Sequence, residues 1–227
     1  MHLITFVPNV LTAEELGKIR TGLKSARYVE GVTSAGGAAR EVKNNQQVAS
    51  DNPQYEGLAD IVRGAFTRNA MLWTALLPAS VTRVIFNHYG QAMQYGPHVD
   101  SPLMGTMGDL LRVDIAVTLF LSDPSSYAGG ELTVRNGGGA EQTFKEAAGS
   151  AIAYPANSVH HVTPVTGGAR DAAILWVQSL VRDPAKRELL WDLDRAQRDL
   201  YGREGRTATF EAVSRSHANL LRMWADV

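Results

Sequence analysis

Two residues near the middle of the chain have the types and the spacing of metal ligands. His98 and Asp100 stand two positions apart in the run Tyr-Gly-Pro-His-Val-Asp, and on an extended backbone residues at this spacing project from the same face. An imidazole and a carboxylate on one face can occupy two neighbouring corners of a metal octahedron. A third ligand has to come from another strand, and His160 and His161, more than sixty positions further on, are the candidates.

Two histidines and one carboxylate on one face of an octahedron leave three adjacent coordination positions open. This arrangement is typical of non-haem Fe(II) oxygenases. An isolated His-x-Asp is a weak signal, and the distal histidine on an expected strand strengthens it. Because neighbouring residues on a strand face opposite sides, only one of His160 and His161 can point inward.

Arg170 follows His160 by ten positions, across the turn Thr-Gly-Gly at residues 166–168 and at the start of the next expected strand. In one large oxygenase class a 2-oxo acid chelates iron through its keto and C1 carboxylate oxygens, so its far carboxylate needs a cation inside the barrel. Guanidinium is always charged and binds a carboxylate through two parallel hydrogen bonds. An arginine beside a turn is by itself more often solvated, but the spacing to His160 favours the pocket.

The elements that must position these residues change in kind along the chain. Short β-rich runs separated by glycine turns fill residues 81–180 and indicate a jelly-roll barrel. Helical patterns precede and follow them. The expected strands are residues 81–89, 113–121, 131–134, 150–154, 159–165 and 172–180.

Start signals mark the expected helices. Thr12 and Glu15 form a capping box, and Asn52-Pro53 and Asp183-Pro184 each combine a cap with a proline at the first helical position. Residues 183–224 then predict a helical hairpin. Between the first two helices we expect a mobile glycine-rich loop at residues 31–40 and a solvated polar segment at residues 43–47, although its amides also suit a binding surface.

We therefore expect an α+β protein with a double-stranded β-helix (jelly-roll) core. N-terminal helices pack on this core, and a C-terminal helical hairpin is attached to it. The expected division is an N-terminal helical and mixed region at residues 1–79, a core domain at residues 80–180 and a helical appendage at residues 181–227.

Composition excludes several classes. A formal net charge of -1 gives no basic footprint for nucleic acid or an anionic membrane. The chain has no cysteine, which excludes disulfide scaffolds, thiolate zinc sites and cysteine nucleophiles. No apolar run is long enough to span a membrane, and the first eight residues lack the features of a signal peptide. We expect a cytoplasmic protein.

The combination of His98, Asp100, His160 and Arg170, with Tyr89 and Tyr95 upstream, resembles the prolyl 4-hydroxylase-type branch of the Fe(II)/2-oxoglutarate dioxygenases. Four further runs resemble the bacterial PKHD-type hydroxylases more closely, and the resemblance extends over the whole chain. They are residues 42–48 (VKNNQQV), 118–124 (TLFLSDP), 129–132 (GGEL) and 160–165 (HHVTPV).

The resemblance implies a hydroxylase that uses Fe(II), 2-oxoglutarate and O2, with L-ascorbate (vitamin C) as a further reductant that keeps iron reduced. It implies His98, Asp100 and His160 as the metal ligands, with His161 facing the other way. Arg170, Tyr89 and Tyr95 are the expected cofactor-binding residues, with Arg170 and the Tyr89 hydroxyl on 2-oxoglutarate and Tyr95 as a wall of the metal pocket. A structural role stays open for each tyrosine. No catalytic side chain is needed beyond the metal centre.

Two other classes of function remain open on the residues alone. A zinc hydrolase also uses two histidines and a carboxylate, but it usually adds a general-base carboxylate near the metal-bound water. A noncatalytic ligand-binding jelly roll needs neither three ligands nor a buried arginine. The substrate stays open as a small molecule, a peptide or a protein, and the C-terminal helices offer an apolar face for a homodimer.

Several polar residues have no assigned role in the sequence. Lys43, Asn44 and Asn45 could contact substrate, and so could Arg112 and Asp114, although the last two are equally consistent with a salt bridge. His88 is expected to face away from Tyr89, its neighbour on the strand. The four tryptophans, Trp176 among them, are expected to serve packing rather than binding.

Overall fold

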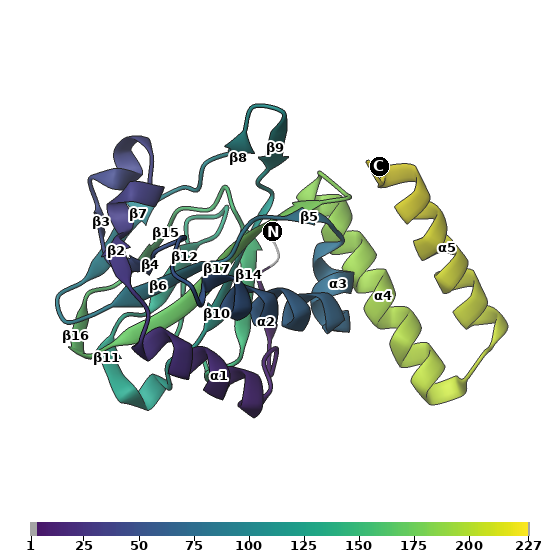
Figure 1. Cartoon of the computed structure of the whole chain (residues 1–227). Coiled ribbons are helices and arrows are strands. Elements are labelled where there is room, and N and C mark those ends of the chain that lie inside the picture. The colour runs from purple at the N-terminus through teal and green to yellow at the C-terminus, as the bar shows by residue number, and fades with distance from the viewer. Residues whose placement is uncertain (1–3, 227) are drawn as a thin grey trace.

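Two antiparallel β-sheets and a set of helices make up the structure, a computed structural model that describes residues 4–226. The sheets form the double-stranded β-helix that the sequence predicts, and the C-terminal helical hairpin stands beside them (Figure 1). No helix among the described residues is long and apolar enough to cross a membrane.

The larger sheet has eight strands, and its central strands are long and buried on both faces. In spatial order it contains β1 (Thr5–Val7), β14 (Ala151–Pro155), β10 (Ile115–Phe120), β17 (Arg170–Ser179), β6 (Ile85–Tyr89), β4 (Gln46–Val48) and β2 (Tyr28–Glu30), and β5 (Pro78–Val81) also pairs with β17.

The smaller sheet has five strands and carries the candidate metal ligands. Its order is β13 (Glu141–Phe144), β12 (Leu132–Arg135), β15 (His160–Val162), β7 (Gln94–His98) and β3 (Lys43–Asn44). Two separate two-stranded sheets complete the strands, the hairpin of β8 (Leu103–Thr106) with β9 (Asp109–Arg112) and the pair of β11 (Tyr127–Gly129) with β16 (Val165–Gly168).

Alternate side chains of β10 and β17 pack into two different hydrophobic cores, one on each face of the larger sheet. Val117 and Leu175 belong to the large cluster that the N-terminal helices cover, whereas Phe120 packs with Leu132 and Val134 of the smaller sheet. Successive side chains of a strand point to opposite faces, so every second residue of these strands enters the space between the sheets. Their sequences do not alternate between apolar and polar residues, because both faces of these strands are buried.

Three helices cover the outer face of the larger sheet, α1 (Ala13–Lys24), α2 (Tyr55–Arg68) and α3 (Ala70–Leu76). The capping box at α1 is confirmed, since Thr12 accepts from the Glu15 backbone and the Glu15 side chain accepts in return. The predicted start of α2 is wrong. Asn52 accepts from the backbone N–H of Gln54 in a turn before the helix, so the helix begins at Tyr55.

The C-terminal hairpin consists of α4 (Pro184–Glu204) and α5 (Ala208–Trp224). Asp183 caps α4 by accepting from the Ala185 backbone and Pro184 takes the first position, as the sequence predicts. A small apolar cluster joins the hairpin to the end of β17 and to α3. It contains Leu77, Val181 and Leu190, with Leu220, Leu221 and Trp224 packed against them.

The N-terminal region not only covers the larger sheet with helices but also adds strands to both sheets. Its short strands β1, β2 and β4 extend the larger sheet, and β3 extends the smaller one. The glycine-rich segment expected as a loop forms two 3-10 turns, η1 (Gly31–Ser34) and η2 (Gly37–Arg40). The expected strand at residues 159–165 is divided into β15 and β16, because Thr163 donates its N–H to Glu131 and Pro164 has no N–H. The domain division stays a prediction.

We expect Leu175→Ala to lower the free energy of unfolding by about 2–5 kcal/mol, since it leaves a cavity under the helices. Ile174→Ala on the same strand is the matched control. Its side chain faces the space between the sheets and is only half-buried, so the loss should be smaller. Urea titration of both variants checks the order, and equal losses would contradict the division of β17 between two cores.

Candidate metal centre

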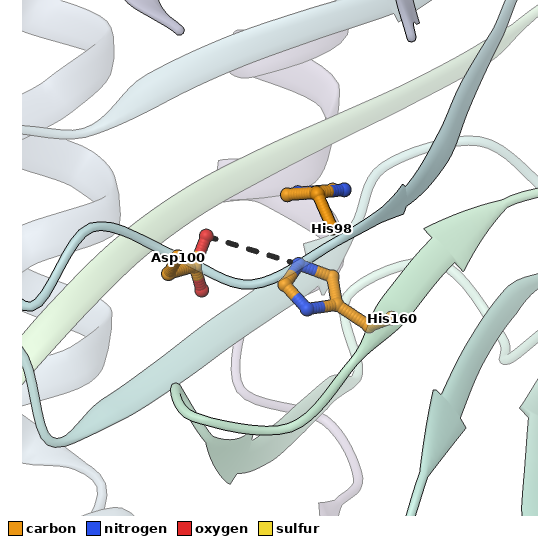
Figure 2. Close-up of side chains that lie close together, drawn as sticks. All are labelled: His98, Asp100 and His160. Atoms are coloured by element: carbon orange, nitrogen blue, oxygen red, sulfur yellow. Dashed lines mark ion pairs between the residues drawn. The ribbon is translucent and has the colours of Figure 1, made fainter. Parts of the chain in front are cut away.

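The pairing of two strands of the smaller sheet brings the three predicted metal ligands together. His160 on β15 lies directly opposite His98 on β7 in the antiparallel register, and Asp100 follows β7 by two positions. Nε2 of His160 lies 3.8 Å from Oδ1 of Asp100, and one ligand atom from each of the three residues lies within 4.8 Å of the others. Figure 2 shows the three side chains converging from the two chain segments.

Backbone carbonyls orient both imidazoles. Nδ1 of His98 lies 2.8 Å from the Gly96 carbonyl oxygen, and Nδ1 of His160 lies 3.0 Å from that of Ser158. A carbonyl only accepts, so each Nδ1 carries the proton and each Nε2 keeps its lone pair. This is the arrangement that metal-binding histidines commonly have.

Burial disfavours charge on the ligands in the absence of a cation. Desolvation and then the neighbouring His160 lower the pKa of His98 to about 3, which leaves its imidazole neutral near pH 7. Desolvation raises the pKa of Asp100, against the opposing influence of His160 and the Trp176 indole. Oδ2 of Asp100 is buried and has no hydrogen-bond partner among the described residues. Two imidazole lone pairs and an unpartnered carboxylate oxygen fit a divalent cation.

Arg170 is a second buried group with polar atoms that no described residue partners. It is 1% exposed, and its Nε and Nη1 have no hydrogen-bond partner within residues 4–226. The guanidinium carbon lies 5.1 Å from the Tyr89 ring centroid and 5.7 Å from that of Phe120. A buried, unpaired guanidinium costs several kcal/mol, and a bound carboxylate would remove that cost. The arginine therefore fits an anion site.

The metal triad and Arg170 open into one pocket between the two sheets, with about 770 Å³ of empty space counted to its open mouth. All six residues that the sequence proposes for the site line it: Tyr89, Tyr95, His98, Asp100, His160 and Arg170. Tyr89 lies opposite Arg170 in the register of β6 and β17. The Tyr95 ring stacks on His98 with centroids 3.6 Å apart and planes 16° apart.

His161 does not line the pocket. It is half-buried and lies opposite Thr133 of β12, on the other face of the smaller sheet. His88 likewise faces away from Tyr89, with Nδ1 2.8 Å from an Asp171 carboxylate oxygen. Arg112 and Asp114 form a salt bridge at 2.8 Å and do not line the pocket.

The sequence analysis missed part of the pocket wall. The segment expected to be solvated buries Asn45 and Gln47, which donate to Oδ1 of Asn87 on β6 at 2.9 and 2.8 Å. Trp176, expected only to pack, also lines the pocket. Spacing could have identified two of these residues, because Asn87 shares the parity of Tyr89 and Trp176 that of Arg170.

The chain matches two family models. Residues 84–178 match the 2OG-Fe(II) oxygenase superfamily, and residues 184–226 match the PKHD-type hydroxylase C-terminal domain. A PKHD-type hydroxylase of Picosynechococcus sp. is 46% identical over 220 residues, which cover 97% of this chain and 98% of that protein. One of Acaryochloris marina is 46% identical over 224 residues, which cover 99% of this chain and all of that protein.

Solved structures share the fold at low sequence identity. A Pseudomonas putida prolyl-4-hydroxylase has a TM-score of 0.53 at 18% identity, covering 78% of this chain and 94% of that one. The epimerase SnoN, in complex with Fe3+, alpha ketoglutarate and nogalamycin RO, has a TM-score of 0.54 at 17% identity, covering 81% and 82%. HygX from Streptomyces hygroscopicus, with nickel and 2-oxoglutarate bound, has 0.53 at 12% identity, covering 79% and 84%.

We expect His98→Ala and Asp100→Ala each to weaken Fe(II) binding by about a hundredfold or more, since losing even a residue that only orients a ligand costs 10–100-fold. Anaerobic titration with Fe(II), followed by metal analysis after gel filtration, measures the loss. His88→Ala is the control, because His88 is a half-buried histidine on the opposite face. Full iron occupancy in both ligand variants would contradict the assignment.

The two neighbouring histidines should behave differently. His160→Ala should remove Fe(II) binding, whereas His161→Ala should leave the metal affinity nearly unchanged, because only His160 faces Asp100. The same titration compares the two variants. If the phenotypes were exchanged, the register of β15 against β7 would be wrong by one residue.

Proposed function

Since this chain belongs to the PKHD-type hydroxylases of the 2OG-Fe(II) oxygenase superfamily, we propose that it hydroxylates its substrate at the expense of 2-oxoglutarate and O2. One oxygen atom enters a C–H bond as a hydroxyl group. The other enters the succinate that forms as 2-oxoglutarate loses CO2. The observation that carries this proposal is the single pocket shared by a metal triad and a buried, unpaired arginine.

His98, Asp100 and His160 would hold Fe(II) by one face, which leaves positions for 2-oxoglutarate and O2. Bound Fe(II) supplies the activation of O2 that no side chain provides. The Gly96 and Ser158 carbonyls fix the two imidazole planes, and the Tyr95 ring holds that of His98 from its face. The protein therefore supplies a preformed ligand set.

Arg170 would bind the far carboxylate of 2-oxoglutarate through its planar fork. Tyr89 contacts the guanidinium from the adjacent strand, and we assign its hydroxyl to the same carboxylate. Both side chains are 1% exposed, so water competes poorly for this ion pair. Holding the co-substrate at its far end directs its keto acid end to the metal.

The pocket gives little support to a hydrolase. Of the described residues that line it, Asp100 is the single carboxylate, and it belongs to the metal triad. A zinc hydrolase would need a further carboxylate as general base beside the bound water. A noncatalytic jelly roll leaves both the triad and the unpaired arginine without a purpose.

Ascorbate would act here only by keeping iron reduced. The homodimer and the cytoplasmic location stay predictions.

Arg170→Ala should spare Fe(II) binding and raise the dissociation constant of 2-oxoglutarate by about ten- to a hundredfold. A hydrogen bond to a charged group contributes roughly 1.5–3 kcal/mol, and each ~1.4 kcal/mol is tenfold. Arg170→Lys should recover part of the affinity, because it restores the charge without the fork. Anaerobic titration of the iron-loaded variants with 2-oxoglutarate, followed by its charge-transfer absorbance, measures both.

Unchanged 2-oxoglutarate affinity in Arg170→Ala would assign the far carboxylate to another residue. Failure of the iron-loaded wild-type protein to bind 2-oxoglutarate would overturn the function itself. A reaction under 18O2 then tests the oxygen balance. One labelled oxygen atom is expected in the released succinate and the other in the hydroxylated product.

A further inference from the structure

Lys43 is a cation of the pocket that neither the metal triad nor the 2-oxoglutarate site uses. It lies on β3 directly opposite Tyr95 on β7, and it lines the same pocket as the candidate metal ligands. Its Nζ lies 4.8 Å from the Tyr95 ring centroid, and that ring stacks on His98. The ammonium group and a metal ligand therefore lie against the same aromatic ring.

The ammonium group has spare hydrogen-bonding capacity. Its hydrogen bond among the described residues goes to Oγ of Ser34 in η1, at 2.9 Å. An ammonium group has three donors, and no carboxylate within residues 4–226 forms a salt bridge with Lys43. Burial lowers the pKa of Lys43 to about 8, so the side chain is mainly charged at neutral pH.

A charge balance of the loaded pocket leaves Lys43 unmatched. Apart from the two histidines, the lining residues with acidic carboxylate or basic side chains are Lys43, Asp100 and Arg170, and histidines that bind a metal are neutral while a metal-bound carboxylate is ionised. A divalent metal against Asp100, and the two carboxylates of 2-oxoglutarate against Arg170, bring the total of these groups to zero. Lys43 then adds one positive charge that nothing in the pocket compensates.

The position of Lys43 suits a substrate rather than the co-substrate. Arg170 lies on the larger sheet between the Tyr89 and Phe120 rings and is almost completely buried. Lys43 lies on the last strand of the smaller sheet, is half-buried, and contacts the η1 turn. The two cations thus occupy different sheets of the pocket, and the metal triad belongs to the sheet of Lys43.

Resting on the function proposed above, we propose that Lys43 recognises the substrate, and that this substrate presents a carboxylate to it. The carboxylate would accept hydrogen bonds from the lysine donors that Ser34 leaves free, and it would neutralise the loaded pocket. Charge-assisted hydrogen bonds of this kind are about twice as strong as neutral ones. The site thereby selects acids over their amides and places the acid group on the Tyr95 side of the metal.

The test uses the full chain loaded with Ni(II) and 2-oxoglutarate, so that binding is measured without turnover. The probes are N-acetyl amino acids as free acids and as amides, and acetylated tripeptide amides with a central Glu or Gln. Dissociation constants come from ligand-observed NMR. Wild-type protein should bind acids about tenfold or more tightly than the matched amides. The free acids and the Glu peptides distinguish a small acid from an acidic peptide.

Lys43→Met should abolish the preference for acids while leaving 2-oxoglutarate affinity within about twofold of wild type, and Lys43→Arg should retain part of the preference. Lys186→Met is the matched control, since Lys186 also lies half-buried over an aromatic ring, 5.5 Å from the Trp224 centroid, but outside the pocket. Ser34→Ala removes the hydrogen bond and keeps the cation, so it should retain the preference.

Three outcomes overturn the proposal. They are equal binding of acids and amides or no binding of acids by wild type, an unchanged preference in Lys43→Met, and a loss of 2-oxoglutarate rather than of acids in that variant. Failure of the wild-type protein to bind 2-oxoglutarate at the loading step would instead overturn the proposed function.

Discussion

Two buried ionisable side chains with unpartnered polar atoms govern the organisation of this protein. The Asp100 carboxylate and the Arg170 guanidinium both face the space between the sheets, and both retain unpartnered polar atoms among the described residues. Removing an ion from water costs several kcal/mol unless a counter-ion compensates it. The large apolar cluster under the helices provides stability on the opposite face of the larger sheet. The desolvation cost is why the proposed function has two ions complete the pocket, a cation at Asp100 and an anion at Arg170.

The helices make this arrangement possible from the opposite side of the larger sheet. They bury the outer residues of β10 and β17 in one large apolar cluster, which frees the inner residues of the same strands to serve the pocket. Arg170 and Trp176 share the inner face of β17, whereas Leu175 and Val177 stabilise the outer one. A strand packed on both faces has a fixed backbone, so the side chains that it contributes to the site are held in fixed positions.

Adjacent strands of the smaller sheet contribute neighbouring polar and aromatic side chains to the site. Lys43, Tyr95, His98 and His160 come from three adjacent strands, and the Tyr95 ring contacts both the ammonium group and the first imidazole. The same Tyr95 ring stacks on His98 and lies 4.8 Å from Nζ of Lys43, so the metal ligand and the proposed substrate contact share one aromatic neighbour. The two cations of the pocket lie on different sheets, and the proposals give them different ligands, the co-substrate for Arg170 and the substrate for Lys43.

Local signals in the sequence were sufficient for the ligand pattern, the helix starts at Thr12 and Asp183, and the β-rich middle of the chain. The fold class is confirmed, and the six candidate residues lie in one pocket, while their roles in binding stay predictions. These features depend on residues that are a few positions apart. The alternation of side chains along a strand, or the geometry of a capping box, directly sets how such residues lie relative to one another.

What only the tertiary structure decided are the contacts between distant segments. β3 and β4 have two and three residues, too few to show a period, so nothing local reveals that Asn45 and Gln47 are buried. Their partner Asn87 lies some forty positions away, and its Oδ1 accepts from both amide nitrogens. Lys43 is likewise defined by Tyr95 on another strand. Hydrogen bonding and desolvation at such positions depend on which strands pair, and that is a property of the whole fold rather than of any segment.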